Sequence, residues 1–135
     1  MKISDRDILE IRKYDKTNEL RVLIVDDELD ICYLLGGILK QKKLKTAYVN
    51  TLSDAEVAIK SDPPEILFLD NHLPDGFGLD FIRYVKVNAP FTKIIMITAH
   101  DSAAERNKAY SEGVDFFISK PFNRDIIYST IDQIA

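Results

Sequence analysis

The chain has 135 residues, of which 46% are hydrophobic, so it can bury the core of one compact domain. Its net charge of −4 argues against direct binding to nucleic acid, and its single cysteine excludes an internal disulfide or a multi-cysteine metal site. No apolar run approaches the ~20 residues of a membrane span and the N-terminus lacks a signal peptide, so we expect a soluble cytoplasmic protein with no membrane contact.

Residues 1–19 hold five basic and five acidic side chains and few apolar ones. We interpret them as an N-terminal extension to a domain that covers residues 20–135. Ser4–Asp7 could cap one short helix with Ile8 and Ile11 on one face, and the alternative is a solvated tail. A role of this extension in forming a homodimer is one hypothesis.

Five short segments of the remaining chain have the composition of β-strands. Four are continuously apolar, which is typical of parallel strands that are covered on both faces, and one mixes polar and apolar side chains as an edge strand does. In chain order these strands are Arg21–Val25, Leu44–Val49 (the edge strand), Ile66–Leu69, Ile94–Ile97 and Phe116–Ile118.

Helical patterns follow each strand. The first covers Leu29–Lys43 and includes a Gly36-Gly37 pair, which we attribute to close packing against a neighbour. The signals for the other helix ends are capping boxes at Ser53–Glu56 and Ser102–Glu105, a stop before Pro90, a C-terminal Gly113 and a cap at Asn123. The alternation of five strands and five helices predicts an α/β fold with a doubly wound parallel sheet.

Polar side chains follow four of these strands directly. Asp26 and Asp27 follow the first, Asp70 the third, Thr98 the fourth, and Lys120 comes shortly after the last. Ligands bind at the carboxyl ends of the strands in this type of sheet, so we expect the five side chains to lie together. Crowded carboxylates call for a hard divalent cation, Mg²⁺ or Mn²⁺. A metal, an amine and a hydroxyl around one open carboxylate indicate a phosphoryl-transfer site with Asp70 as the nucleophile.

Other interpretations exist for each residue and for the set. An Asp after a strand is often only a helix cap, and Lys120 alone would be a surface lysine. A metal-dependent phosphatase with an aspartyl nucleophile would have Asp-x-Asp after its first strand, and a nucleotide-binding domain would have a Gly-rich loop there. The chain has Asp26-Asp27 at that point instead. The joint placement at four strand ends favours phosphoryl transfer.

These residues resemble the receiver domain of two-component response regulators. The matching segments are Val22–Glu28, Ile66–Asp70, Pro74, Gly78, Met96–Ala99 and Phe117–Pro121. The resemblance implies a flavodoxin-like (βα)5 fold with a five-stranded parallel sheet of strand order 2-1-3-4-5. It also implies a signalling phosphoacceptor of the stand-alone chemotaxis-regulator type, which is not an enzyme beyond its own phosphorylation and dephosphorylation.

The resemblance further implies a role for each site residue. Asp70 is the phosphoacceptor and takes the phosphoryl group from a sensor histidine kinase or a phosphotransfer protein. Asp26, Asp27, Asp70 and the backbone carbonyl of His72 hold Mg²⁺, which Mn²⁺ can replace. Lys120 pairs with Asp70 and then with the phosphoryl group, and the Lys120–Pro121 peptide bond is cis.

Thr98 and Phe117 are the implied switch residues. On phosphorylation they change the surface formed by the fourth helix, the last strand and the last helix, and a downstream protein target binds this surface. Tyr is frequent at the position of Phe117, so this switch lacks a hydroxyl group. His72 is expected near the phosphoryl group, where it could alter dephosphorylation; the alternative is an exposed loop histidine. Two other hypotheses stay open: a docking module independent of phosphorylation, and the N-terminal piece of a longer DNA-binding response regulator.

Overall fold

The computed structural model describes Ser4 and residues 20–134. The short helix predicted within residues 1–19 lies outside these residues, except for Ser4. The main sheet has five parallel strands in the order β2-β1-β3-β6-β7, which is the order 2-1-3-4-5 when only its own strands are numbered. The predicted fold and strand order are thus confirmed. The strands are β2 (Lys45–Val49), β1 (Arg21–Val25), β3 (Ile66–Leu69), β6 (Lys93–Thr98) and β7 (Phe116–Ser119).

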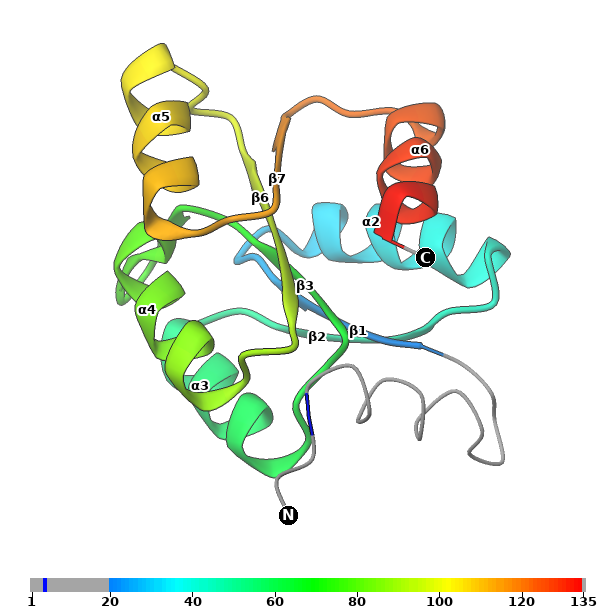
Figure 1. Cartoon of the computed structure of the whole chain (residues 1–135). Helices are drawn as coiled ribbons and strands as arrows, with labels where there is room; N and C mark the ends of the chain where they lie inside the picture. The colour runs from blue at the N-terminus through cyan, green and yellow to red at the C-terminus, as the bar shows by residue number, and fades with distance from the viewer. Residues whose placement is uncertain (1–3, 5–19, 135) are drawn as a thin grey trace.

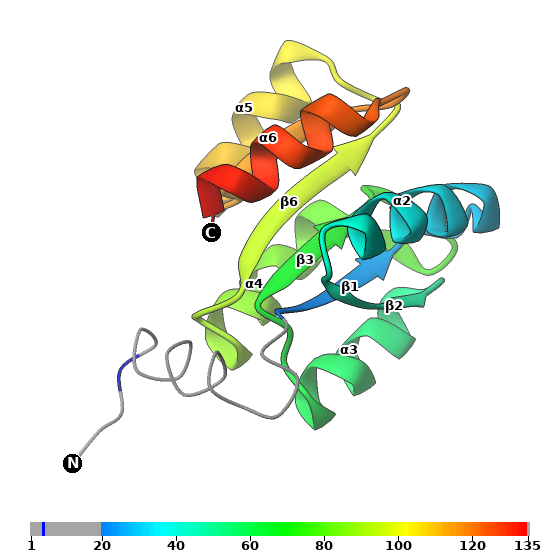
Figure 2. The same cartoon turned by 90° about the vertical axis from the view of Figure 1, so that its right-hand side faces the viewer.

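Helices cover both faces of this sheet (Figures 1 and 2). One layer consists of α2 (Leu29–Gln41) and α6 (Arg124–Ile134). The other consists of α3 (Leu52–Ser61), α4 (Gly78–Asn88) and α5 (Ala103–Glu112). Figure 1 shows α2 and α6 on the right of the sheet and the other three helices on the left, so the sheet is doubly wound.

The core lies on both sides of the sheet because strand side chains alternate between its faces. In β3, Leu67 and Leu69 join the apolar cluster under α3, α4 and α5, whereas Ile66 and Phe68 join the cluster under α2 and α6. All four side chains are completely buried. This explains the continuously apolar pattern of β3, and burial of one such side chain is worth about 1.5–3 kcal/mol. The edge strand β2 is largely exposed, as its mixed composition predicted.

Four of the predicted helix ends are confirmed. The helix α4 ends at Asn88, before Pro90. The Ser102 hydroxyl accepts a hydrogen bond from the Glu105 amide (3.1 Å) at the start of α5. Gly113 ends that helix with φ 112°, a left-handed conformation that glycine adopts without strain. The Asn123 side chain accepts from the Ile126 amide (2.9 Å) at the start of α6.

The capping box predicted at Ser53–Glu56 is wrong. Thr51 caps α3, since its hydroxyl accepts from the Asp54 amide (3.1 Å). The Asp75 carboxylate accepts from the amides of Leu52 (2.9 Å) and Ser53 (3.0 Å), which holds the pKa of Asp75 below its ordinary value. The local cap at Thr51 and a carboxylate from a distant loop thus share the first amides of the helix, which lets it begin earlier than predicted.

Two further details differ from expectation. A short antiparallel hairpin of β4 (His72–Leu73) and β5 (Gly76–Phe77) follows β3 and was not predicted. The close packing expected at the glycine pair of α2 is absent: a Cβ at Gly36 would lie 4.0 Å from the Thr46 hydroxyl, and one at Gly37 would have nothing within 4 Å. Among the described residues, no helix is both long and apolar enough to cross a membrane.

Candidate functional site

Three carboxylates gather at the carboxyl edge of the sheet. The Asp26 amide donates to the Val49 carbonyl (3.1 Å) and the Asp70 amide to the Val25 carbonyl (2.9 Å), so the sheet hydrogen bonds continue one residue beyond β1 and β3. Because these strands are neighbours, Asp26 and Asp70 end side by side. Each of Asp26, Asp27 and Asp70 has a carboxylate oxygen within 4.8 Å of the others. The structure therefore brings the predicted acidic residues together.

Lys120, at the end of β7, supplies a positive charge to this cluster. Its Nζ lies 2.7 Å from Asp26 Oδ2, 2.9 Å from Glu28 Oε1 and 3.7 Å from Asp70 Oδ2. The lysine thus pairs most closely with Asp26 and Glu28 here, and Asp70 is the more distant partner. Although burial alone would lower it, the pKa of Lys120 is raised by its hydrogen bonds to Asp26 and Glu28, so the amine stays cationic. The Lys120–Pro121 peptide bond is cis, as implied.

Glu28 was not among the predicted site residues. The only signal in the sequence is its place as the third acid of the run that begins at Asp26. Its amide donates to Asp26 Oδ1 (2.9 Å), and its carboxylate holds Lys120 from the solvent side, since Glu28 is exposed. Glu28 therefore helps to hold the lysine beside the acidic cluster, from its solvent side.

The site carries more negative charge than one lysine can balance. Burial raises the pKa of Asp26, against the opposing effect of its hydrogen bond from Lys120. Burial and then the charge of Asp26 raise the pKa of Asp70 to about 6, although Lys120 and the backbone amides of Asn71 and His72 lower it. The Asp70 side chain is only 6% exposed, so water screens this repulsion poorly.

The donor set fits a hard divalent cation. All three ligand groups are carboxylates, and Asp27 is exposed, which leaves the site open to water and to phosphate oxygens as Mg²⁺ requires. The nearby Cys32 thiol donates to the Asp26 carbonyl (3.3 Å), and burial raises its pKa to about 11, so it stays a thiol rather than a soft ligand. The donor set thus agrees with the Mg²⁺ that the resemblance to receiver domains implies.

The loop that carries Asp70 is bound to the start of α4. The Gly78 amide donates to the Asn71 carbonyl (2.8 Å), and the Leu79 amide donates to Asn71 Oδ1 (2.9 Å). A Cβ at Gly78 would lie 2.2 Å from the Asp70 carbonyl oxygen, so only glycine permits this approach. Asn71 was not predicted to matter, because its partner Leu79 is eight residues away and no local pattern indicates the bond.

Thr98 and Phe117, the predicted switch residues, lie on β6 and β7. Thr98 is completely buried at the end of β6, where its hydroxyl oxygen accepts from the His100 amide (3.2 Å). Phe117 is half-buried against the core under α3, α4 and α5, and the Arg106 guanidinium lies 5.2 Å from its ring centre. Their switching roles stay predictions, as does the ligand role of the His72 carbonyl.

Comparisons with known proteins agree with this geometry. Residues 22–132 match the family model of the response regulator receiver domain. The chain is 37% identical over 101 residues to the response regulator protein PilR of Pseudomonas aeruginosa, a match that covers 75% of this chain and 23% of PilR. It is 32% identical over 120 residues to PmrA of the same organism, covering 86% of this chain and 52% of PmrA. The chain thus spans about a quarter to about a half of these curated relatives.

A solved structure of a receiver domain is also similar to this chain. The solution structure of the beryllofluoride-activated NtrC4 receiver domain dimer superposes with a TM-score of 0.81 at 37% identity, covering 84% of this chain and 94% of that one. The family match covers most of the chain, and the doubly wound fold and acidic cluster accompany it. The chain therefore belongs to the receiver domains of two-component response regulators.

Proposed function

We propose that this domain accepts a phosphoryl group on Asp70 from a phosphohistidine of a sensor histidine kinase or a phosphotransfer protein. The observation that carries the proposal is the setting of Asp70. Its nearly buried carboxylate lies between two further acids, Asp26 and Asp27, and the Lys120 ammonium at 3.7 Å. The excess of negative charge supports a Mg²⁺ held by these acids, and Mn²⁺ suits the same donors.

The reaction forms an Asp70 O–P bond as the donor's N–P bond breaks, and the donor imidazole leaves with a proton. When bound, Mg²⁺ neutralises charge on the phosphoryl oxygens. Lys120 neutralises a further oxygen, and it needs only a short movement because Asp26 and Glu28 already hold its ammonium within 4 Å of Asp70. The backbone amides of Asn71 and His72, which lower the pKa of Asp70, orient its carboxylate.

Switching would start at Thr98. Its hydroxyl oxygen accepts a bond from the His100 amide, so the hydroxyl hydrogen is available for a phosphoryl oxygen. Movement of Thr98 makes room for Phe117, whose ring leaves the Arg106 guanidinium and turns inward. The surface of α5, β7 and α6 is then repacked, and a downstream protein target reads it.

A second candidate concerns the wider protein. The curated relatives are longer than this chain, and one of them is named a DNA-binding transcriptional regulator, NtrC of Proteus hauseri, of which the match covers 24%. This supports a role as the receiver part of a longer DNA-binding regulator. The dimer of the NtrC4 receiver supports a homodimer as the activated form. Molar mass in solution before and after phosphorylation tests the dimer, and an unchanged mass would count against it.

Phosphorylation is tested by incubating the chain with a small acyl phosphate donor, with Mg²⁺ or with EDTA, and measuring intact mass. We expect one added phosphoryl group with Mg²⁺ and none with EDTA. Asp70→Asn should abolish it, and Asp80→Asn, which changes an exposed acid at the start of α4, should not. Equal labelling of the Asp70→Asn variant would contradict the proposal, and no labelling of the wild type would favour a docking module.

A further inference from the structure

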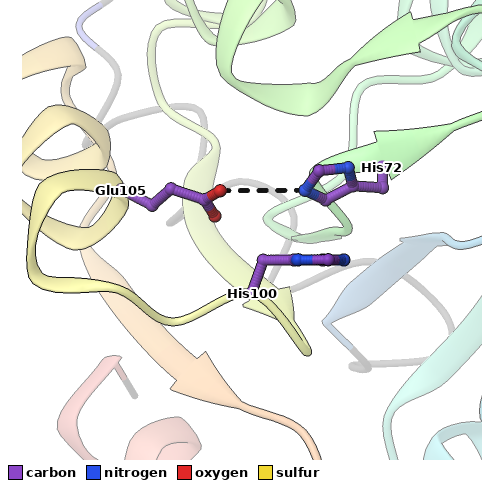
Figure 3. Close-up of side chains that lie close together, drawn as sticks. All are labelled: His72, His100 and Glu105. Atoms are coloured by element: carbon purple, nitrogen blue, oxygen red, sulfur yellow. Dashed lines mark ion pairs between the residues drawn. The ribbon is translucent and has the colours of Figure 1, made fainter.

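We propose that His72, His100 and Glu105 form a second metal site, for a divalent transition ion such as Zn²⁺, on the segments that follow Asp70 and Thr98. One ligand atom from each residue lies within 4.8 Å of those of the other two. His72 lies in β4, His100 in the loop after β6, and Glu105 in the first turn of α5. Figure 3 shows the Glu105 carboxylate pointing at the His72 ring, with the His100 ring alongside.

The two histidines of this cluster are the only ones in the chain. Although they are far apart in the sequence, their ring centroids are 3.8 Å apart with the rings tilted by 40°. The Phe77 ring contacts His72 edge-on at 5.5 Å, which limits how far the His72 ring can turn. The fold therefore holds the half-buried His72 ring against the exposed His100 ring.

Two side-chain atoms of the cluster that could bind the metal lack hydrogen bonds. His72 Nε2 and Glu105 Oε2 are both shielded from solvent and have no hydrogen-bond partner among the described residues. His72 Nε2 and Glu105 Oε1 are 3.8 Å apart, too far for a hydrogen bond. Shielded polar atoms without partners are costly, and an ion between them would satisfy both.

The donor types select the ion. Two imidazoles and one carboxylate form a common three-residue zinc set, with a fourth position for water. Imidazole nitrogen suits Zn²⁺, Cu²⁺ or Ni²⁺ better than Mg²⁺, so this site and the all-carboxylate site should take different metals. Tetrahedral ligands about 2.0–2.1 Å from a zinc ion lie ~3.3 Å from each other, so the 3.8 Å pair must close by ~0.5 Å. A groove of about 310 Å³, lined in part by His72 and Glu105, gives access.

The position of the cluster gives the ion a regulatory effect, which rests on the proposed function of Asp70. His72 comes two residues after Asp70, and His100 comes two residues after Thr98. A bound ion would tie β4, the loop after β6 and α5 together. It would restrict the movement of Thr98 and narrow the access of a phosphodonor to Asp70, so we expect slower phosphorylation.

Zinc binding is measured on the full chain by competition with a chromophoric chelator, in excess Mg²⁺ so that the carboxylate site is filled. We expect one Zn²⁺ per chain. His72→Gln, His100→Gln and Glu105→Gln should each weaken its affinity at least about tenfold. The matched control Glu112→Gln, at the other end of α5, should bind as the wild type does.

Two more variants test whether Zn²⁺ binds at the carboxylate site or at the cysteine instead. Asp27→Asn and Cys32→Ala should keep full zinc affinity, because neither residue belongs to the cluster. Circular dichroism and cooperative urea unfolding show that each variant is folded. Wild-type zinc affinity in both histidine variants, or its loss in Asp27→Asn or Cys32→Ala alone, would overturn the proposed site.

The effect of Zn²⁺ on phosphorylation is measured separately, as the rate of labelling by the acyl phosphate. Zn²⁺ at a saturating level should slow labelling by the acyl phosphate several-fold in the wild type and leave the rate of His100→Gln unchanged. An equal rate in the wild type with and without Zn²⁺ would overturn the regulation but not the metal site. Failure of Asp70 labelling without Zn²⁺ would instead overturn the proposed function, since zinc binding is measured without phosphorylation.

Discussion

Replacement of Asp70 by Asn should make the metal-free protein more stable at neutral pH. The wild-type carboxylate is nearly buried and faces the charge of Asp26, and these two effects raise its pKa from the ordinary 3.8 to about 6. Asn has the same shape, and its Oδ1 can still accept from the Asn71 and His72 amides. Lys120 keeps its closer partners at 2.7 and 2.9 Å, so no cation is left unpaired.

The magnitude and its pH dependence follow from the pKa rise. A pKa difference of one corresponds to about 1.4 kcal/mol, so ionised Asp70 costs the folded protein ~3 kcal/mol. The folded state binds the Asp70 proton more tightly than the unfolded state does. The free energy of unfolding of the wild type, compared with that of the Asn variant, is therefore most favourable below about pH 4. It falls behind that of the variant as the pH rises through about 6.

Urea unfolding in EDTA at pH 4 and pH 7.5, followed by circular dichroism, measures this difference. We expect similar stabilities at pH 4 and an advantage of ~3 kcal/mol for Asp70→Asn at pH 7.5. Asp80→Asn should change stability by less than about 0.5 kcal/mol at either pH. Saturating Mg²⁺ should stabilise the wild type more than the Asn variant. An Asn variant that is no more stable than the wild type at pH 7.5 without metal would show that ionised Asp70 does not destabilise the fold.

Other substitutions test the fold and the site. Gly37→Ala should stabilise the protein by up to ~1 kcal/mol in urea unfolding, whereas Gly78→Ala should destabilise it and weaken Mg²⁺ binding, because its Cβ would lie 2.2 Å from a carbonyl oxygen. Thr51→Ala should cost about 1 kcal/mol as a lost cap and Ser53→Ala much less, and the reverse order would contradict the observed start of α3. Lys120→Gln should slow acyl phosphate labelling at least about a hundredfold, and an unchanged rate would exclude its role in neutralising charge.

Much of the fold was predictable because burial on both faces leaves a plain pattern. A strand such as Ile66–Leu69, whose four side chains are all buried, must be apolar throughout. The polar residues that follow such strands stand out, and the common direction of the strands brings Asp26 and Asp70 to one edge. For this reason the acidic cluster and Lys120 could be predicted without a structure.

The remaining features depend on contacts between distant segments. The cap of α3 was predicted at the wrong residue because the Asp75 carboxylate, from beyond β3, binds the amides of Leu52 and Ser53. The two-residue strands of the hairpin after β3 are too short to show alternation. The pairing of His72 with His100 arises from the spatial approach of two loops, for which neither loop has a local signal.

Asp70, and no neighbouring acid, should receive the phosphoryl group. Borohydride reduces an aspartyl phosphate to homoserine, so peptide mass spectrometry after labelling with Mg²⁺ and borohydride treatment locates the modified residue. We expect homoserine at position 70 and at no other carboxylate. Homoserine at Asp26 or Asp27 with Asp70 unmodified would contradict it.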